Sequence, residues 1–161
     1  MNMSYKAAVI TVSDKGYKGE RVDTSGPAVR EMLLAAGFEV VYGSVVPDER
    51  GMIAAELRKC GETVGADIIV TTGGTGLSAR DVTPEATRDV ISREIPAIPQ
   101  AMLYYSLGIT PRAMLSRAVA GVMGNSLIIN LPGSEKAARE NLSGVIGTLD
   151  HALKMLAGGG H

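Results

Sequence analysis

Short apolar runs alternate with segments of helical pattern in the first half of the chain, and this alternation constrains the fold most strongly. The apolar runs have strand length and end in polar or glycine residues, and the segments between them place apolar side chains on one helical face. The runs cover residues 5–14, 38–46 and 66–72, and the helical segments cover 25–36, 49–63 and a stretch that starts at Thr83. Such alternation is typical of an α/β protein with a mostly parallel sheet.

An antiparallel element follows in the second half of the chain. Residues 117–123 and 126–132 flank a Gly124-Asn125 turn, a pattern typical of a β-hairpin. The preceding segment, residues 95–115, has a helical composition that prolines interrupt, at Pro96, Pro99 and Pro111. We therefore expect the hairpin to lie at one side of the parallel sheet.

Short polar side chains stand where three predicted helices begin: Asp48, Thr83 and Ser134. These residue types are favoured N-caps, and Pro84 suits the first turn after Thr83. Ser134 is expected to cap one long final helix over residues 135–156. A disordered tail is expected over residues 157–161.

Length and composition bound the class of protein. The 161 residues predict a single domain, 1–161, and the 45% hydrophobic content is enough for a buried core. A net charge of −1 argues against a nucleic-acid partner. The lone Cys60 cannot form an internal disulfide, and no apolar stretch approaches the roughly 20 residues that cross a bilayer. We expect a soluble cytoplasmic protein with no membrane partner.

Polar residues follow all three predicted parallel strands. Ser13 and Asp14 end the first strand, Asp48 follows the second, and a glycine-rich loop with Asp81 follows the third. Open parallel sheets bind ligands outside the carboxyl ends of their strands. The topology therefore predicts that these residues share one edge of the sheet.

The glycine-rich loop consists of Gly73, Gly74, Thr75 and Gly76. Glycines permit positive φ and close approach of a ligand, and successive backbone N–H groups attract anions. The loop fits neither the dinucleotide pattern G-x-G-x-x-G nor the P-loop, which needs a lysine after its last glycine. A tight turn without a ligand is an equally good interpretation of the loop alone.

Asp48 and Asp81 have a structural interpretation as well as a chemical one. Each stands where a cap or turn residue belongs. Carboxylates beside a phosphate-binding loop instead indicate Mg²⁺, because this hard cation prefers oxygen ligands. Lys15, Arg80 and Arg117 are available to add positive charge.

Several stretches together resemble one known family. The sequence "TTGGTGLSARDVTPEAT" is similar to the signature of the molybdenum-cofactor biosynthesis family, which includes molybdopterin adenylyltransferases and the G domain of gephyrin. The stretches "TVSDKG", "VPDER", "AMLSRAVAGV" and "NLPGSEKAARENL" agree in the same order. The resemblance covers nearly the whole chain, from about residue 6 to residue 156.

The resemblance implies a fold and an activity. The fold would be a three-layer α/β sandwich, the molybdenum-cofactor biosynthesis protein fold, assembled as a homotrimer or a dimer of trimers. The activity would be transfer of adenylate from ATP to molybdopterin with Mg²⁺, with release of pyrophosphate. The adenylylated product would pass to a molybdenum-inserting enzyme.

Site residues follow from the resemblance and from the strand ends. The resemblance places the catalytic, metal-binding carboxylates at Asp48 and Asp81. It places substrate contacts at Gly73, Gly74, Thr75, Gly76, Ser106, Ser116, Asn130, Pro132, Gly133 and Ser134. The strand ends add Ser13 and Asp14, and Arg117 adds a cation. We expect Ser116, Asn130 and Ser134 to contact molybdopterin, and the glycine loop and Asp81 to contact the phosphates.

Three alternatives remain at this point. The chain is a pterin-binding paralogue with weak catalysis, a gephyrin-like scaffold that binds protein partners, or a nucleotide-processing domain of the same fold with another substrate. Retention of both Asp48 and Asp81 favours the enzyme.

Overall fold

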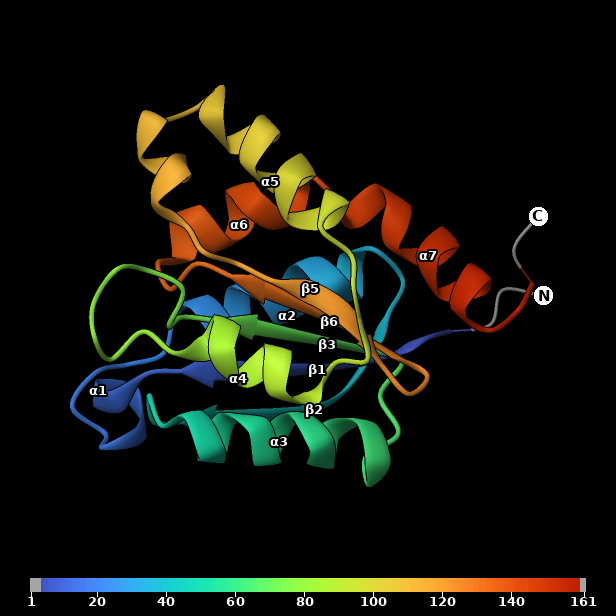
Figure 1. The fold of residues 1–161 in the computed structure, drawn as a ribbon, viewed down its shortest axis with the longest axis horizontal. Coiled ribbons are helices and arrows are strands. Elements are labelled where there is room, and N and C mark those ends of the chain that lie inside the picture. Colours follow the sequence, from blue (N-terminus) through green and yellow to red (C-terminus); the bar gives the residue numbers. More distant parts are fainter. Residues whose placement is uncertain (1–3, 160–161) are drawn as a thin grey trace.

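A six-stranded sheet with the strand order β2-β1-β3-β6-β5-β4 forms the centre of the protein (Figure 1). The computed structural model describes residues 4–159. The strands are β1 (Lys6–Val12), β2 (Glu39–Val46), β3 (Ile68–Thr72), β4 (Arg93–Glu94), β5 (Ala120–Met123) and β6 (Ser126–Leu131). Strands β2, β1, β3 and β6 are parallel, whereas β5 pairs antiparallel with β6 and β4. The predicted α/β class, parallel sheet and antiparallel hairpin are confirmed.

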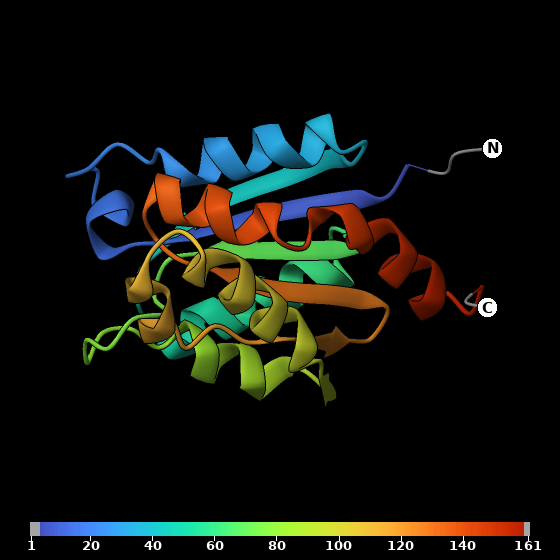
Figure 2. The same ribbon diagram turned by 90° about the horizontal axis from the view of Figure 1, so that it is seen from above.

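Helices cover both faces of the sheet. One layer contains α2 (Ser25–Ala35), α5 (Ala97–Leu107), α6 (Glu135–Ser143) and α7 (Leu149–Leu156), and the other contains α3 (Arg50–Glu62) and α4 (Thr83–Val90). Figure 2 looks onto the first layer, where α6 lies between α2 and α5. Successive side chains of β1 point to opposite faces of the sheet, so Val9 packs against the layer of α2 and Ile10 packs against the layer of α3. The result is a three-layer sandwich.

The three prolines of residues 95–115 begin helices rather than break one. Pro96 is the N-cap of α5, and Pro99 lies in its first turn, where a missing N–H removes no intrahelical bond. Pro111 starts a short 3-10 helix, η1 (Pro111–Leu115). The helical segment is therefore two consecutive helices.

The final helix is not continuous as predicted. Helix α6 ends at Ser143, a 3-10 turn, η2, spans Ile146–Thr148, and α7 follows. Gly144 lies at the break, where a side chain would come within 2.9 Å of Tyr105 Cβ on α5. Close packing against α5 therefore fixes the position of the break.

The end of the described chain caps α7. The predicted disordered tail covers residues 157–161, of which 157–159 donate backbone hydrogen bonds to Leu153, Met155 and Lys154. Residues 160–161 lie outside the described part of the chain. Within residues 4–159 no helix combines the length and the apolar character needed to cross a membrane.

The strand order places a switch point beside β1. The chain leaves β1 for β2 through α2 on one face, then returns through α3 on the other face to β3, on the far side of β1. The connections therefore diverge at the carboxyl ends of β1 and β3. Such divergence opens a crevice in which ligands bind.

Candidate active site

A cavity of about 350 Å³ lies in the crevice at the carboxyl ends of β1 and β3. We call this cavity the first lobe of the site. The predicted site residues that line it are Ser13, Asp48, Gly73, Gly74, Asp81, Gly133 and Ser134. They come from four separate segments of the chain: the ends of β1, β2 and β3, and the turn after β6. The predicted convergence at one edge of the sheet is confirmed.

A second cavity of about 350 Å³ adjoins the first. Both cavities are lined by Gly74, Asp81 and Gly133, so these residues form the boundary between two lobes. The sequence-predicted residues of the second lobe are Gly74, Thr75, Gly76, Asp81, Ser106, Ser116, Pro132 and Gly133. Residues of α5, η1 and α6 complete its lining.

The glycine loop needs its first two glycines for conformation and for space. Gly73 and Gly74 have φ values of 100° and 72°, a region that side chains disfavour. A Cβ atom on Gly73 would lie 2.2 Å from the Val12 carbonyl oxygen, and one on Gly74 would lie 2.2 Å from Thr83 Oγ1. The loop is therefore pressed between β1 and α4.

The backbone N–H groups of the glycine loop differ in whether they are already hydrogen-bonded within the protein. The Gly73 amide donates to the Leu131 carbonyl at 3.0 Å, so it serves the fold. The amides of Gly74, Thr75 and Gly76 donate to no other residue within 4–159. These three N–H groups are the donors that an anion in the crevice would meet.

Asp48 is not the cap of α3. That helix begins at Arg50, with Glu49 at the N-cap and no side-chain capping bond. Instead Asp48 Oδ2 accepts from the Asp14 amide at 2.8 Å, and the Asp48 amide donates to Asp14 Oδ1 at 3.0 Å. Burial raises the pKa of Asp48, and the charges of Asp14 and Asp81 add to the rise.

Asp81 closes a turn within its own loop. Its Oδ2 atom accepts from the Ser78 amide at 2.9 Å. Thr83, predicted as the cap of α4, is instead the first residue of that helix, and its hydroxyl donates to the Gly73 carbonyl at 2.9 Å. This bond joins α4 to the glycine loop. No side chain caps the helix itself.

The glycine loop passes between the two carboxylates. A Cβ on Gly74 would lie 3.3 Å from Asp48 Oδ1, and one on Gly76 would lie 2.9 Å from Asp81 Oδ2. Residues 4–159 contain no group of three or more His, Cys, Asp or Glu side chains that could hold a metal ion. Two carboxylates that line the same cavity do fit Mg²⁺, which is commonly held by one or two carboxylates together with substrate phosphates.

Asp14, a predicted substrate contact, instead pairs with an arginine. Arg80 donates from Nε and Nη2 to the two carboxylate oxygens at 3.1 and 3.0 Å, and from Nη2 to Glu49 at 2.9 Å. This pairing lowers the pKa of Asp14. Asp14 therefore supports Asp48 and Arg80, and it does not line either lobe.

Comparison with known proteins decides the family. The family described as "Probable molybdopterin binding domain" matches residues 8–151. The chain is 40% identical over 153 residues to molybdopterin adenylyltransferase of Helicobacter pylori strain J99, across 93% of this chain and 86% of the relative.

The chain belongs to the molybdopterin-binding domain family.

Two further similarities support the assignment. The crystal structure of the molybdopterin biosynthesis enzyme MoaB from Thermus thermophilus superposes with a TM-score of 0.91, at 50% identity over 96% of this chain and 97% of that chain. The molybdenum cofactor synthesis protein cinnamon of Drosophila melanogaster is 42% identical over 150 residues. That match covers 92% of this chain but spans a quarter (25%) of cinnamon.

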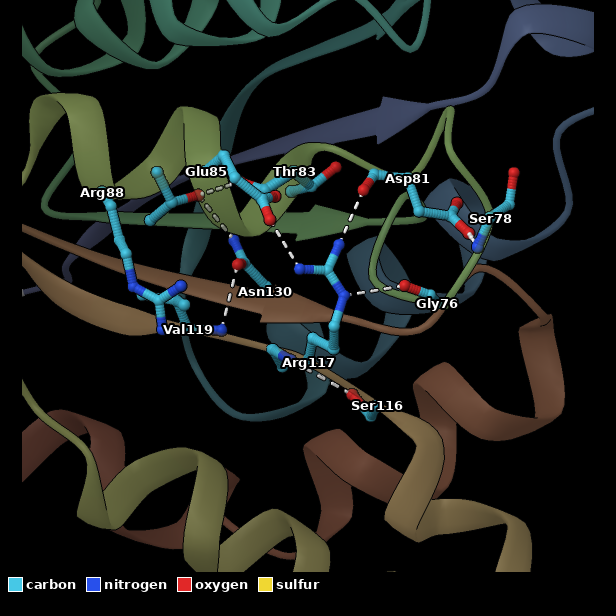
Figure 3. A network of polar contacts seen from close by, with 12 residues as sticks. Gly76, Ser78, Asp81, Thr83, Glu85, Arg88, Ser116, Arg117, Val119 and Asn130 are labelled. Atoms are coloured by element: carbon cyan, nitrogen blue, oxygen red, sulfur yellow. Dashed lines mark hydrogen bonds and ion pairs between the residues drawn. The ribbon is translucent and has the colours of Figure 1, made fainter.

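Arg117 lies outside both lobes of this molybdopterin-binding domain, contrary to its predicted substrate contact. Its guanidinium donates to the carbonyl oxygens of Gly76 at 2.9 Å and Asp81 at 2.7 Å, and to Glu85 at 2.5 Å (Figure 3). The side chain is therefore directed at the backbone of the loop. Sequence position alone does not distinguish this from a ligand contact.

Asn130 is also outside the lobes, because its side chain is wholly buried within β6. Its Nδ2 donates to Thr71 and Thr87 hydroxyls at 3.0 Å each, and its Oδ1 accepts from the Val119 amide at 3.1 Å (Figure 3). All its polar groups are used inside the domain. The expected contact with molybdopterin is therefore corrected to a role in the core.

The four predicted serines divide between the two lobes, with Ser13 and Ser134 in the first and Ser106 and Ser116 in the second. Ser134 caps α6 by accepting from the Ala137 amide at 3.1 Å and lines the first lobe, not the lobe of Ser116. Ser106 lines the second lobe, and its buried hydroxyl has no hydrogen-bond partner in the described chain. A buried hydroxyl without a partner marks a position for a ligand atom or water.

Several lining residues were not predicted from the sequence. The first lobe includes Thr11, Asp23 and Ser25, and the second includes Thr110, Arg112 and Asn141. Asp23 accepts from the Thr11 hydroxyl at 2.7 Å and from the Gly26 amide at 3.0 Å, so it joins the end of β1 to the start of α2. An aspartate just before the Ser25-Gly26-Pro27 helix start was the available signal.

Proposed function

We propose that this domain is a molybdopterin adenylyltransferase, which transfers adenylate from ATP to molybdopterin and releases pyrophosphate. The observation that carries the proposal is the pair of cavities that meet at Gly74, Asp81 and Gly133. A transferase of this kind must hold two anionic substrates in contact. The naming of relatives as molybdopterin adenylyltransferase supports the same reaction.

Each lobe suits one substrate. The first lobe, with Asp48 and the carboxyl end of β1, would hold ATP with its phosphates toward Gly74. The second lobe would hold molybdopterin, since the unpartnered Ser106 hydroxyl and the Ser116 side chain offer hydrogen bonds to a polar ring. The terminal phosphate of the pterin and the α-phosphate of ATP would then meet beside Asp81.

The reaction forms one bond and breaks one. An oxygen of the molybdopterin phosphate attacks the α-phosphorus, and the bond from that phosphorus to the α,β-bridging oxygen breaks to release pyrophosphate. The attacking phosphate is already largely deprotonated at neutral pH, since its second pKa is about 6, so the step needs no general base. The amides of Gly74, Thr75 and Gly76 would donate to the phosphates and align them.

Asp48 and Asp81 would hold the divalent cation. Bound Mg²⁺ supplies neutralisation of phosphate charge and fixes the phosphate orientation. Without a cation the two carboxylates would repel both substrates. Burial already raises the pKa of Asp48, and the neighbouring charges of Asp14 and Asp81 add to that rise. The carboxylate pair therefore favours catalysis over simple pterin binding.

We further propose a homotrimer, or a dimer of trimers, of single-domain chains in the cytoplasm. Apolar side chains stand exposed along α5 and η1, where Tyr104 is 86% and Met114 is 62% exposed. Large apolar patches of this kind mark protein interfaces. The single Cys60 suits a reducing compartment. The adenylylated product would pass to a molybdenum-inserting enzyme.

Incubation with molybdopterin and Mg-ATP tests the proposal. Mass spectrometry should detect adenylyl-molybdopterin, with pyrophosphate in equal amount. Molybdopterin binding without product would instead identify a pterin-binding module. Binding of neither substrate would contradict the assignment of both lobes.

A further inference from the structure

We propose that Arg117 is a positioning residue, which fixes the Asp81 carboxylate. It does so by bonding to the carbonyl groups of Gly76 and Asp81, which are the two ends of the loop 76–81 and form its neck. The inference rests on the proposed function, in which Asp81 is a ligand of the catalytic cation. It assigns to Arg117 a role through the backbone rather than through substrate.

The guanidinium holds both ends of the loop at once. Nε donates to the Gly76 carbonyl at 2.9 Å, and Nη2 donates to the Asp81 carbonyl at 2.7 Å (Figure 3). Neither carbonyl oxygen accepts a hydrogen bond from any other residue within 4–159. These two carbonyls therefore depend on one side chain, whereas the Thr83 amide and hydroxyl hold the preceding carbonyls of Gly74 and Gly73 at 3.1 and 2.9 Å.

The arginine is itself held in place from two directions. Its amide donates to the Thr75 carbonyl at 2.9 Å, and its Nη1 donates to Glu85 on α4 at 2.5 Å. The pair is partly shielded, with side-chain exposures of 35% for Arg117 and 33% for Glu85. A planar guanidinium can satisfy two carbonyls and a carboxylate together, whereas a lysine ammonium lacks this fixed fork.

Beyond the neck the loop has little support. Residues 77–80 are exposed, and the turn is held internally by the Ser78 amide on the Asp81 carboxylate and the Asp81 amide on the Ser78 carbonyl, at 2.9 and 3.0 Å. Arg80 at the tip pairs with Asp14 and Glu49, with its own side chain 54% exposed. Loss of the neck bonds should therefore let the Asp81 carboxylate shift, and a displacement of about 1 Å can cost roughly 100-fold in rate.

Steady-state kinetics of Arg117→Ala separate positioning from substrate contact. We expect kcat to fall by roughly 100-fold and the Mg²⁺ concentration for half-maximal rate to rise, with the KM for molybdopterin within about twofold of the parent. Added guanidinium ion should restore part of kcat, and Arg117→Lys should lie between parent and alanine variant. Arg50→Ala is the matched control, because it removes a two-bond arginine–aspartate pair between α3 and α4, and neither residue of that pair lines a lobe. It should leave all these values unchanged.

Hydrogen exchange gives a readout that does not require turnover. In the substrate-free protein, the Ser78 and Asp81 amides should exchange faster in Arg117→Ala than in the parent, and at the parent rate in Arg50→Ala. If the parent forms no product, the proposed function fails while this comparison still decides the role of Arg117. If the alanine variant does not fold, Arg117→Lys and Glu85→Gln take its place in both assays.

Two results would overturn the inference. One is unchanged exchange at Ser78 and Asp81 in folded variants. The other is a rise in the KM for molybdopterin with unchanged kcat and Mg²⁺ dependence, which would make Arg117 a substrate contact.

Discussion

Asp14 and Asp48 exchange two hydrogen bonds, in which the amide of each donates to the carboxylate of the other, at 2.8 and 3.0 Å. The exchange joins the segment after β1 to the segment after β2, and the Asp48 side chain lines the first lobe. A residue that served only as a helix cap would instead bond to the first turn of α3. The interpretation of Asp48 as a site carboxylate therefore replaces the capping interpretation.

Asp48→Asn is expected to reduce turnover by about 100-fold or more, on the order of the effect of removing one electrostatic group from an active site. The asparagine side chain keeps an oxygen for the Asp14 amide, so the fold should persist. Comparison of kcat and melting temperature with the parent checks both parts. Normal turnover would retire the catalytic role of Asp48.

The same variant has a defined pH dependence of stability. Burial raises the pKa of Asp48 above its usual 3.8, so its ionisation destabilises the folded state as pH rises through that raised value. Asp48→Asn should therefore be at least as stable as the parent at pH 7, with the difference vanishing below about pH 3.8.

Asp89→Asn provides the control of opposite sign. Arg50 lowers the pKa of Asp89, so the charged carboxylate stabilises the folded state above its usual pKa. Melting curves between acidic and neutral pH should show a loss for Asp89→Asn near neutrality. A marked loss for Asp48→Asn near pH 7 would contradict the assigned environment of Asp48.

Gly73→Ala should both destabilise the protein and distort the crevice. The alanine Cβ would meet the Val12 carbonyl at 2.2 Å, at a φ of 100° that side chains rarely adopt. We expect a loss of about 3 kcal/mol in the free energy of unfolding, measured by urea denaturation. Gly51→Ala, in α3 with open space around it, should instead be neutral or stabilising by roughly 0.5–1 kcal/mol. Equal effects at the two glycines would argue against the close approach at Gly73.

Asn130→Ala should lower stability rather than pterin affinity. The substitution removes the partner of the buried Val119 amide and the bond to the Thr71 hydroxyl, whereas the Thr87 hydroxyl keeps its bond to the Thr83 carbonyl. Each buried group left without a partner costs about 1–3 kcal/mol, so we expect a loss on the order of 3 kcal/mol in urea denaturation. Asn125→Ala, in the exposed turn between β5 and β6, is the surface control and should stay near the parent. A stable variant with weakened molybdopterin binding would restore the ligand-contact interpretation.

The parts predicted from the sequence are those that follow from periodicity and strand order. The apolar alternation marks β1, β2, β3 and the hairpin, and parallel strands necessarily bring Ser13, Asp48 and the glycine loop to one edge. Helix α1 (Asp14–Tyr17) and β4 were missed because four and two residues are too short to show a period. The break of the final helix depends on packing at Gly144 against α5, which no local pattern records.

The errors in the site have a common physical cause. Arg117 and Asn130 lie in segments that resemble the family, and the sequence places them near the crevice but does not give the direction of their side chains. The Arg117 side chain bonds to backbone carbonyls of the loop, and the Asn130 side chain joins β3, α4 and β6 inside the domain. Direction depends on strand register and on neighbours distant in sequence, as at the Thr71–Asn130 pair of β3 and β6.

Exposed apolar residues predict the oligomeric state. We expect light scattering at micromolar concentration to show a trimer or a dimer of trimers. Met114→Lys places a charge in the apolar face of α5 and η1 and should dissociate the assembly. Met52→Lys makes the same change on the opposite layer, at a methionine that is 45% exposed, and should leave the assembly intact. A monomeric parent, or dissociation by Met52→Lys alone, would contradict this interface.

The proposed reaction depends most on Asp81, because this residue lies where the two lobes meet. Asp81→Asn keeps an oxygen for the Ser78 amide but removes the negative charge that would hold Mg²⁺. The variant should therefore melt as the parent does and fail to adenylylate molybdopterin. Retained turnover would reduce Asp81 to a turn residue.

The most direct measurement follows the position of label in the products. The parent and Asp81→Asn are each incubated with molybdopterin, Mg²⁺ and ATP labelled in either the α-phosphate or the γ-phosphate. We expect the parent to place α-label in the pterin product and γ-label in pyrophosphate, and Asp81→Asn to do neither. Transfer of γ-label to the pterin, release of α-label as free nucleotide only, or full transfer by Asp81→Asn would contradict this expectation.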